Sequence, residues 1–325
     1  MSKKPKVGMW SGLTAVTAVL TAGAIVGTTV AFHYTTTVNN YLDADTYKII
    51  KGDSDEDTEY FKSDFTSDEE RESYEAELCA QVEAEGAALL KNDNNALPLA
   101  SGAKVSLFGH GSVDLMYGGT GSGSVDTSKA PNFKQALEDQ GIQVNSTLWD
   151  LYSSDDMMKN YSRITPAAIS DTLEANTQYA VNEAPWSKLS SAESSFADYG
   201  DAAIVVFSRS GGEGADLPSG ENGTNDSWIK GQEGDGNYLA LSAEEKELLQ
   251  NLKTLKDNGT FKKIIVLINS SNAIEMDFLN PEICGEDYGI DSAMWIGDVG
   301  QTGINGVAQL LAGEVTPSGS LGDSY

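Results

Sequence analysis

AAIVVFS at residues 202–208 is an unbroken apolar run that leads directly into a polar, glycine-rich segment, RSGGE at 209–213. A second run of this kind, KIIVLINS, occupies residues 263–270. Continuous apolar runs of this length are typical of strands that are covered on both faces. The two runs therefore predict the central strands of a mostly parallel sheet, with loops that carry function beyond their carboxyl ends.

Strands and helices alternate along the rest of the chain. Further strands are predicted at 104–108, from about 142, and at 292–296. Helices are predicted at 67–90, 131–140, 167–175, 189–196, from Ser242 through Leu255, and at 302–312. Capping boxes at Ser67 and Ser242 and glycines at 141 and 313 give the helix ends. The expected fold is α/β, a mostly parallel sheet sandwiched by helices.

Composition excludes several partners. The chain has 325 residues and a formal net charge of -28, from 49 acidic and 21 basic side chains. Such a charge repels nucleic acid and anionic lipid surfaces. Cys79 and Cys284 lie far apart without the spacing of a metal site, and they could pair only if the domain is exported. No metal and no cofactor is expected.

The N-terminus predicts export. Residues 1–9 carry lysines, and residues 10–32 form an uncharged run long enough to cross a membrane as a helix. The charge asymmetry favours a single-pass anchor in the cell membrane with the body outside. The alternative is a cleaved signal peptide that ends at Ala22-Gly23-Ala24, which would make the protein secreted. Residues 33–66 are expected to be an acidic spacer, and residues 67–325 the folded domain.

Three loops, 109–125, 209–238 and 271–291, should meet at the carboxyl edge of the sheet. The first, GHGSVDLMYGGTGSGSV, lacks the third glycine of a dinucleotide fingerprint and contains no GKS or GKT. Nucleotide binding is therefore not expected. Its glycines are expected to let the backbone approach a sugar or a second domain closely.

Loop carboxylates are the candidate catalytic groups. Glu213 is flanked by glycines and follows a buried strand at once, so its backbone is fixed while its carboxyl stays accessible. This is how a proton donor would be placed. Glu221 has the features of a solvated side chain. Asp216 and Glu233 lie in the same loop and remain candidates.

The motifs LLKNDNNALPL, AIVVFSRSGGEGADLP, IIVLINSSNAIEMDFL and AMWIGDVGQTGINGVAQLLAGEVTPSGSLGDS, in this order, closely resemble the α/β sandwich domain of glycoside hydrolase family 3, the β-glucosidase type. The resemblance covers about 80 to 325. It implies a retaining β-glycosidase, in which a triosephosphate-isomerase-type barrel carries an aspartate nucleophile and the sandwich domain supplies the acid/base glutamate.

The resemblance implies roles for individual residues. The family's EG-x-D element matches Glu213, Gly214 and Asp216, although Leu217 stands where an arginine is common. Glu213 is the first candidate for the acid/base, and Glu233, in a later EGD element, is the second. Asp216, Arg209 and His110 are expected to bind substrate. In the assembled site Glu213 should have a raised pKa, from partial burial and the charge of the nucleophile.

The resemblance also implies a partner. The first 66 residues are too few for a barrel, which needs about 200 or more. A domain-swapped order is expected, with the sandwich first and the barrel beyond the present chain. This chain would then be inactive on β-linked glycosides by itself. The alternative is a non-catalytic cell-surface domain that binds carbohydrate or acts as a scaffold.

Overall fold

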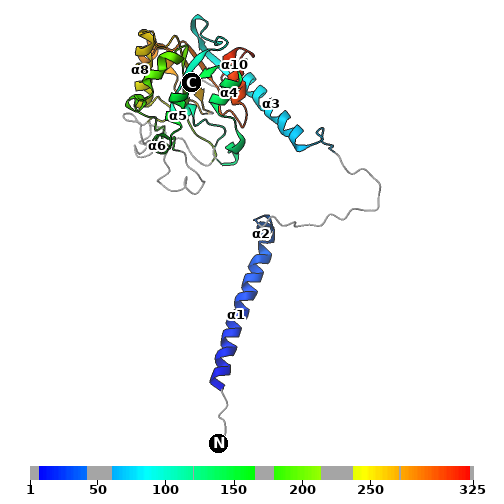
Figure 1. Cartoon of the computed structure of the whole chain (residues 1–325). Coiled ribbons are helices and arrows are strands. Elements are labelled where there is room, and N and C mark those ends of the chain that lie inside the picture. Colours follow the sequence, from blue (N-terminus) through cyan, green and yellow to red (C-terminus); the bar gives the residue numbers. More distant parts are fainter. Residues whose placement is uncertain are drawn as a thin grey trace. The chain divides into compact units, whose positions relative to one another are not determined.

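The structure is a computed structural model that describes residues 7–41, 61–119, 121–164, 179–213, 237–270 and 272–322. It divides into two compact units, residues 1–64 and 65–325. Both units are drawn in Figure 1.

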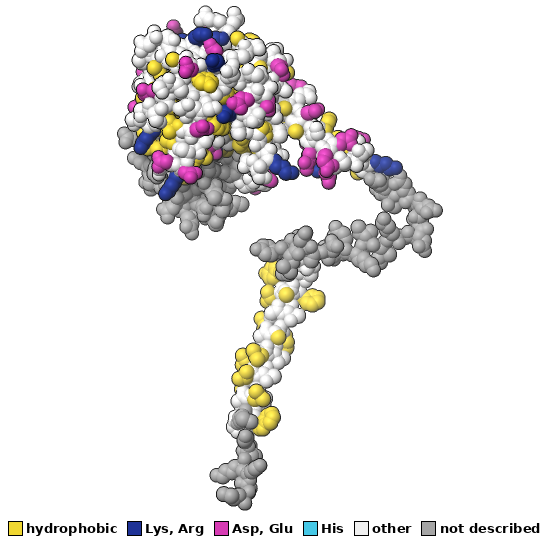
Figure 2. All heavy atoms as spheres, in the orientation of Figure 1, with side chains coloured by type: hydrophobic (Ala, Val, Ile, Leu, Met, Phe, Trp, Pro, Cys, Tyr) yellow, Lys and Arg dark blue, Asp and Glu magenta, His cyan; other side chains and the backbone are white. Residues whose placement is uncertain are grey.

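Unit 1 consists of two helices in its described part, α1 (Val7–His33) and α2 (Thr35–Tyr41). Trp10–His33 is long and apolar enough to cross a membrane. Its apolar side chains are exposed along the whole helix (Figure 2). A membrane span and a signal sequence both have these properties. Helix α2 falls within the segment that we expected to be a spacer.

Unit 2 is built on one six-stranded sheet with the order β1-β6-β5-β4-β2-β3. The strands are β1 (Ala88–Asn92), β2 (Lys104–Phe108), β3 (Gln143–Val144), β4 (Ala202–Ser208), β5 (Ile264–Asn269) and β6 (Ser292–Trp295). All neighbours pair in parallel except β1, which is antiparallel to β6. The sheet is therefore mixed but mostly parallel, as expected for a βαβ alternation.

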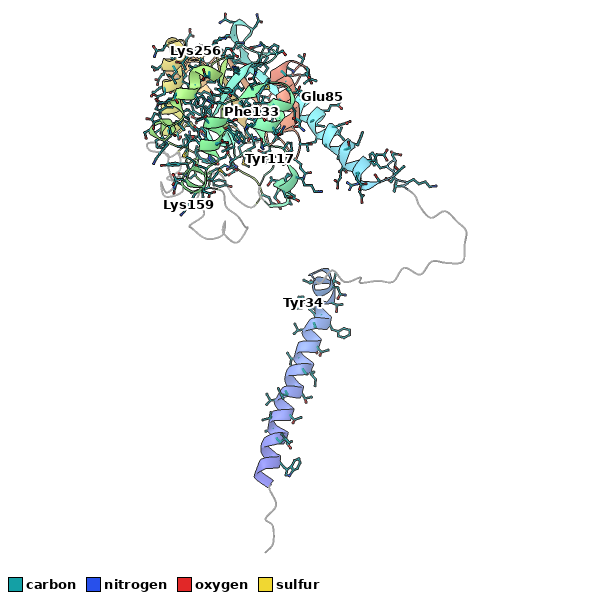
Figure 3. The ribbon with its side chains drawn as sticks, viewed as in Figure 1. Tyr34, Glu85, Tyr117, Phe133, Lys159 and Lys256 are labelled. Carbon is teal, nitrogen blue, oxygen red and sulfur yellow. The ribbon has the colours of Figure 1, made fainter. Side chains whose placement is uncertain are left out.

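The two predicted central strands, β4 and β5, are buried on both faces. Ile204, Val206 and Leu267 belong to one hydrophobic cluster, while Val205 and Val266 belong to the other. Helices α3, α4 and α10 contribute to the first cluster, and α5 and α8 to the second. Figure 3 labels Phe133, the fully buried aromatic residue that α4 contributes. Every buried member of the hydrophobic clusters lies between Ala84 and Leu311, so unit 2 contains its own core.

The helices of unit 2 are α3 (Asp68–Gly86), α4 (Phe133–Asp139), α5 (Ser146–Tyr152), α6 (Asp155–Asn160), α8 (Ala243–Asp257), α9 (Pro281–Cys284) and α10 (Ile304–Ala312). The capping boxes are borne out in part: Ser242 and Glu245 form one at the start of α8, and Ser67 caps α3. Residues 167–175 lie outside the described residues. The helix predicted at 189–196 is replaced by the 3₁₀ turns Trp186–Leu189 and Glu193–Tyr199.

The predicted helix 67–90 is too long by four residues. Helix α3 ends at Gly86, and the following ALLKN forms strand β1 at the edge of the sheet. The apolar run AALL suits either element, and pairing with β6 decides between them. Backbone hydrogen bonding to Ser292–Trp295 extends the sheet by one antiparallel strand at this edge.

Helix α3 is tied to α10 and to the loop after β6. A Cβ atom on Gly306 would overlap the carbonyl of Ala80, so the helices approach at backbone distance. The hydroxyl of Thr302 donates to the carbonyl of Ala76 at 3.0 Å. Glu83 points into this contact, where burial and the nearby Asp298 charge raise the pKa of Glu83 to about 8. Its Oε1 atom is buried and has no hydrogen-bond partner among the described residues.

Replacing the Glu83 carboxyl by an amide tests whether Glu83 is protonated where α3 packs against the domain. The pKa of Glu83 lies near 8 in the folded state against an ordinary 4.5, so the native protein keeps a proton that the unfolded chain releases between these pH values. The free energy of unfolding should therefore fall as pH rises from about 4.5 to 8, by up to a few kcal/mol. The measurement is urea unfolding at pH 5 and at pH 8. In Glu83→Gln the free energy of unfolding should lack the part of the decrease that Glu83 causes.

The matched control is Glu85→Gln, because Glu85 is exposed on the same helix. It should follow the wild-type pH dependence. An identical pH dependence in wild type and Glu83→Gln would show that Glu83 is ionised in the fold.

Candidate active site

The carboxyl ends of β2 and β4 are adjacent, so the loops that follow them meet at one edge of the sheet. The β2 loop runs from Gly109 to Pro131, and the β4 loop begins at Arg209. Tyr117, labelled in Figure 3, braces the first loop because its hydroxyl donates to the carbonyl of Pro131 at 3.0 Å. This edge is where an open α/β sheet binds its ligands.

Glu213 is the exposed carboxylate at this edge. It lies five residues after β4, and its Oε2 accepts hydrogen bonds from the backbone N–H of Ser122, at 2.9 Å, and from the Ser122 hydroxyl. The Ser122 hydroxyl and amide lower the pKa of Glu213, since both bonds favour the ionised form. The raised pKa was expected for an assembled site with a nucleophile nearby, and for that site it stays a prediction.

Ser122 was not among the residues predicted from the sequence. A serine in the glycine-rich stretch GTGSGS has no local feature that distinguishes it from a turn residue. Gly121 beside it has a φ of +68°, and a Cβ atom there would lie 2.9 Å from the Cβ of Glu213. Close approach of the two loops therefore requires glycine at this position.

The first glycines of the β2 loop serve the fold of this domain. A Cβ atom on Gly109 or Gly111 would lie 2.7 or 2.8 Å from the carbonyl oxygen of Val206 in β4. The expectation that these two glycines approach a sugar or a second domain is therefore corrected: they approach the neighbouring strand.

Arg209 is fully buried at the end of β4. Its Nε donates to the carbonyl of Tyr238 at 2.7 Å, and its Nη1 and Nη2 donate to both carboxylate oxygens of Glu245 at 2.8 Å. The carbonyls of Ser208 and Ala240 accept the remaining two N–H groups, at 3.0 and 2.7 Å. All five guanidinium donors are thus used inside the domain.

Burial alone would lower the pKa of Arg209, but the Glu245 carboxylate, together with Tyr238 and Glu183, raises it overall. Through these bonds Arg209 ties the end of β4 to residues 238–245, four positions before Glu213. A sugar hydroxyl would find no free donor on this side chain.

His110 is also buried, with 2% of its surface exposed. Its Nε2 lies 3.2 Å from Asp114, and its backbone N–H donates to Glu183 at 2.7 Å. Within the described part of the chain its Nδ1 has no hydrogen-bond partner. His110 therefore lies beneath the site surface and is separated from solvent.

Two charged groups near His110, the buried Glu183 and the partly buried Arg163, were missed from the sequence. Burial raises the pKa of Glu183 to about 7, with a smaller rise from the charge of Glu245. Arg163 donates to the hydroxyl of Ser208 at 2.8 Å and pairs with Asp114 at 3.2 Å. Both residues come from the segment between 150 and 200, where no clear periodicity marks a buried face. Together they hold the start of the β2 loop against the end of β4.

Two predicted site residues, Asp216 and Glu233, lie in 214–236, outside the described residues. Glu213, Arg209 and His110 are brought to the same edge, but only Glu213 is exposed. No group of three or more His, Cys, Asp or Glu side chains among the residues that the structure describes is arranged to hold a metal ion.

Removing the partner of Arg209 should destabilise the domain severely. Glu245→Gln leaves a buried guanidinium charge without compensation, which costs about 3–5 kcal/mol. Urea unfolding should show this loss, while Asp257→Asn, which breaks an exposed pair with Lys253 on the same helix, should cost less than about 1 kcal/mol. Equal losses in the two variants would contradict the greater contribution of the buried pair.

Comparison with known proteins identifies the fold. Residues 87–325 match the model of the glycosyl hydrolase family 3 C-terminal domain. The β-glucosidase of Ruminococcus albus is 31% identical over 251 residues, which are 76% of this chain and 22% of that protein. β-Glucosidase A of Butyrivibrio fibrisolvens is 30% identical over 266 residues, 77% of this chain and 28% of the relative. The chain thus spans about a quarter of the length of these relatives.

Solved structures agree. A β-glucosidase from Paenibacillus barengoltzii superposes with a TM-score of 0.55 at 28% identity, over 74% of this chain and 23% of that one. β-Glucosidase 3B from Thermotoga neapolitana, solved in complex with glucose, gives the same TM-score at 24% identity, over 76% and 30%, and supports the fold alone. The sheet topology, the matched motifs and these likenesses lead to one conclusion: the chain belongs to glycosyl hydrolase family 3, and residues 87–325 form its C-terminal-type α/β domain.

Proposed function

We propose that this chain supplies the acid/base carboxylate of a retaining β-glycosidase that acts on β-linked glucosides or related sugars. The position of Glu213 carries the proposal: it is exposed at the carboxyl edge, just after a rigid central strand, and the β2 loop holds it through Ser122. Retaining hydrolysis needs a second carboxylate, the nucleophile, about 5–5.5 Å away. A separate barrel domain would supply it.

The pKa of Glu213 constrains how the site would work. Ser122 holds the carboxyl in its ionised form in this chain, whereas an acid must be protonated to deliver a proton to the glycosidic oxygen. Docking of the second domain would exclude water and bring a negative charge close, and both effects raise a carboxyl pKa. The proton donor would therefore form only in the assembled enzyme.

We also infer that the domain works outside the cytoplasm. The support is the apolar stretch Trp10–His33 with lysines ahead of it. Retained as a span, it would anchor the protein in the membrane with unit 2 outside. Cleaved as a signal peptide, it would release a secreted enzyme.

The acid role predicts the kinetics of one substitution. In the complete enzyme, Glu213→Gln should lower kcat about 10²- to 10⁴-fold on glycosides with poor leaving groups. Activated aryl glycosides should lose less in the glycosylation step, because their leaving groups need little protonation. The comparison variant is Glu233→Gln. Full activity in Glu213→Gln together with loss in Glu233→Gln would move the acid role to Glu233.

The division of labour predicts that residues 61–325 fold but do not cleave glycosides. A cooperative thermal transition is expected, because unit 2 contains its own core. Turnover of aryl β-glucosides is expected to stay at background, since the covalent step needs the nucleophile that we assign to the barrel domain. Addition of the separately produced barrel domain should restore it.

Turnover by residues 61–325 alone that disappears in Glu213→Gln would contradict this division. Binding of an immobilised β-glucan that Glu213→Gln leaves unchanged, without any turnover when the barrel is added, would instead support a carbohydrate-binding domain.

A further inference from the structure

We propose that the outer face of α3 is a docking surface for a protein partner that presents an apolar stripe bordered by lysine or arginine side chains. The outer face consists of Tyr74, Leu78 and Val82, which are 52%, 43% and 63% exposed. Their spacing of four residues places them in one row along the helix. The row spans two turns, about 12 Å.

The outer face is distinct from the face that holds α3 to the domain. Ala76, Ala80 and Ala84 face α10, and Ala80 and Ala84 are buried there. Residues two positions apart on a helix point about 200° apart, so the outer face points away from α10. Figure 1 shows α3 lying along α10 and continuing beyond it. This helix is thus apolar on two opposite faces, although a helix on a protein surface normally has one.

The apolar surface continues at the start of the helix. The ring of Phe65 packs against Tyr74 with a centroid distance of 5.3 Å. Four neighbouring apolar side chains therefore form one patch instead of scattered exposures. Contiguous patches of this kind mark interaction sites in soluble proteins.

Charge defines the chemistry of the partner. On the helix surface the outer face is bordered by Glu75, Glu77 and Glu85. The only basic side chain of α3, Arg71, is already bonded to Glu75 at 2.7 Å. Figure 2 shows acidic side chains gathered along this helix. A complementary partner has basic residues around its own apolar stripe.

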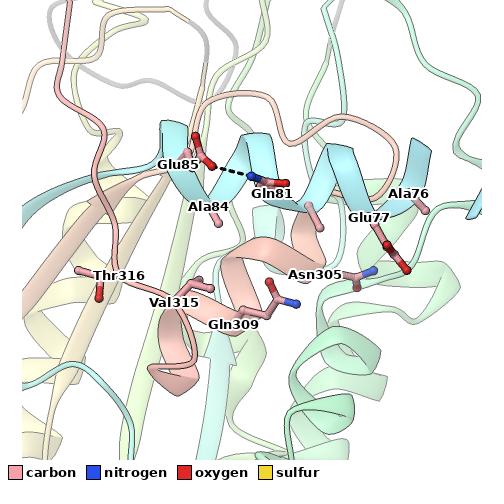
Figure 4. Close-up of a pocket in the computed structure, with 10 residues that line it drawn as sticks. Ala76, Glu77, Gln81, Ala84, Glu85, Asn305, Gln309, Val315 and Thr316 are labelled. Carbon is pink, nitrogen blue, oxygen red and sulfur yellow. Dashed lines mark hydrogen bonds between the residues drawn. The ribbon is translucent and has the colours of Figure 1, made fainter. Parts of the chain in front are cut away.

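A groove beside the outer face fits long basic side chains. It has a volume of about 510 Å³ and lies between α3, α10 and residues 315–316 (Figure 4). Alanines and Val315 form its apolar surface, and Glu77 and Glu85 contribute carboxylates. Lysine and arginine bury their methylene stems on such surfaces while the charged ends meet carboxylates.

The same charges disfavour two other occupants. A second copy of this chain would bring acidic borders against each other, since α3 carries eight acidic residues and one basic residue. An anionic membrane would be repelled by the domain as well. The partner is therefore a different protein surface.

The test uses residues 61–325 and a labelled synthetic amphipathic helix with leucines on one face and lysines at its borders. Fluorescence anisotropy should show binding that weakens as salt rises. Leu78→Ser should weaken it about tenfold or more. Glu77→Gln combined with Glu85→Gln should weaken it and flatten its salt dependence. The thermal midpoint of Leu78→Ser should stay at the wild-type value, because Leu78 is exposed.

The matched control is Ile283→Ser, which removes an exposed apolar side chain of α9 and should leave binding unchanged. A peptide with glutamates in place of the lysines should not bind. Equal binding of both peptides, or equal effects of Leu78→Ser and Ile283→Ser, would overturn the proposal. Self-association of the wild type, or recruitment to phosphatidylcholine vesicles, that Leu78→Ser abolishes would also overturn it, because a second copy or lipid would then cover the face.

Discussion

Burial of β4 on both faces is the constraint on which the domain depends. Every residue of Ala202–Ser208 is buried, and successive side chains enter different hydrophobic clusters. One layer of helices cannot cover such a strand, so the chain must cross the sheet and return on both sides. The same crossovers align the carboxyl ends of β2, β4, β5 and β6 at one edge.

A buried ion pair lies at that edge, at the point where β4 ends. Immediately after β4 the chain must leave a fully apolar environment, and Arg209 secures this exit by bonding to three carbonyls and to Glu245. A buried ion pair adds little net stability compared with apolar packing, but it tolerates only one geometry. The backbone before Glu213 is thus fixed, while the side chain of Glu213 remains exposed.

Sequence patterns predicted the parts of the fold that depend on local periodicity. The runs at 202–208 and 263–270 became β4 and β5, and Ser242 and Glu245 formed the expected capping box. The sequence patterns failed where strand pairing decides the secondary structure. Strand β1 is an example, because its apolar residues suit the end of a helix equally well. The site shows the same division. The exposure of the Glu213 carboxyl could be predicted from its position after a strand. The burial of Arg209 could not, because its partner Glu245 is remote in sequence.

The contact between Ser122 and Glu213 bears on how the proposed acid could be protonated when a second domain docks. The N–H and the O–H of Ser122 both favour the ionised form of Glu213. The domain by itself therefore presents a negative charge at the edge of the sheet where β4 ends. A charged carboxylate favours water and resists burial. A second carboxylate brought close in a dry interface reverses this preference, because two like charges at short range cannot both remain ionised. Docking of the second domain would then raise the pKa of Glu213 and produce the protonated acid.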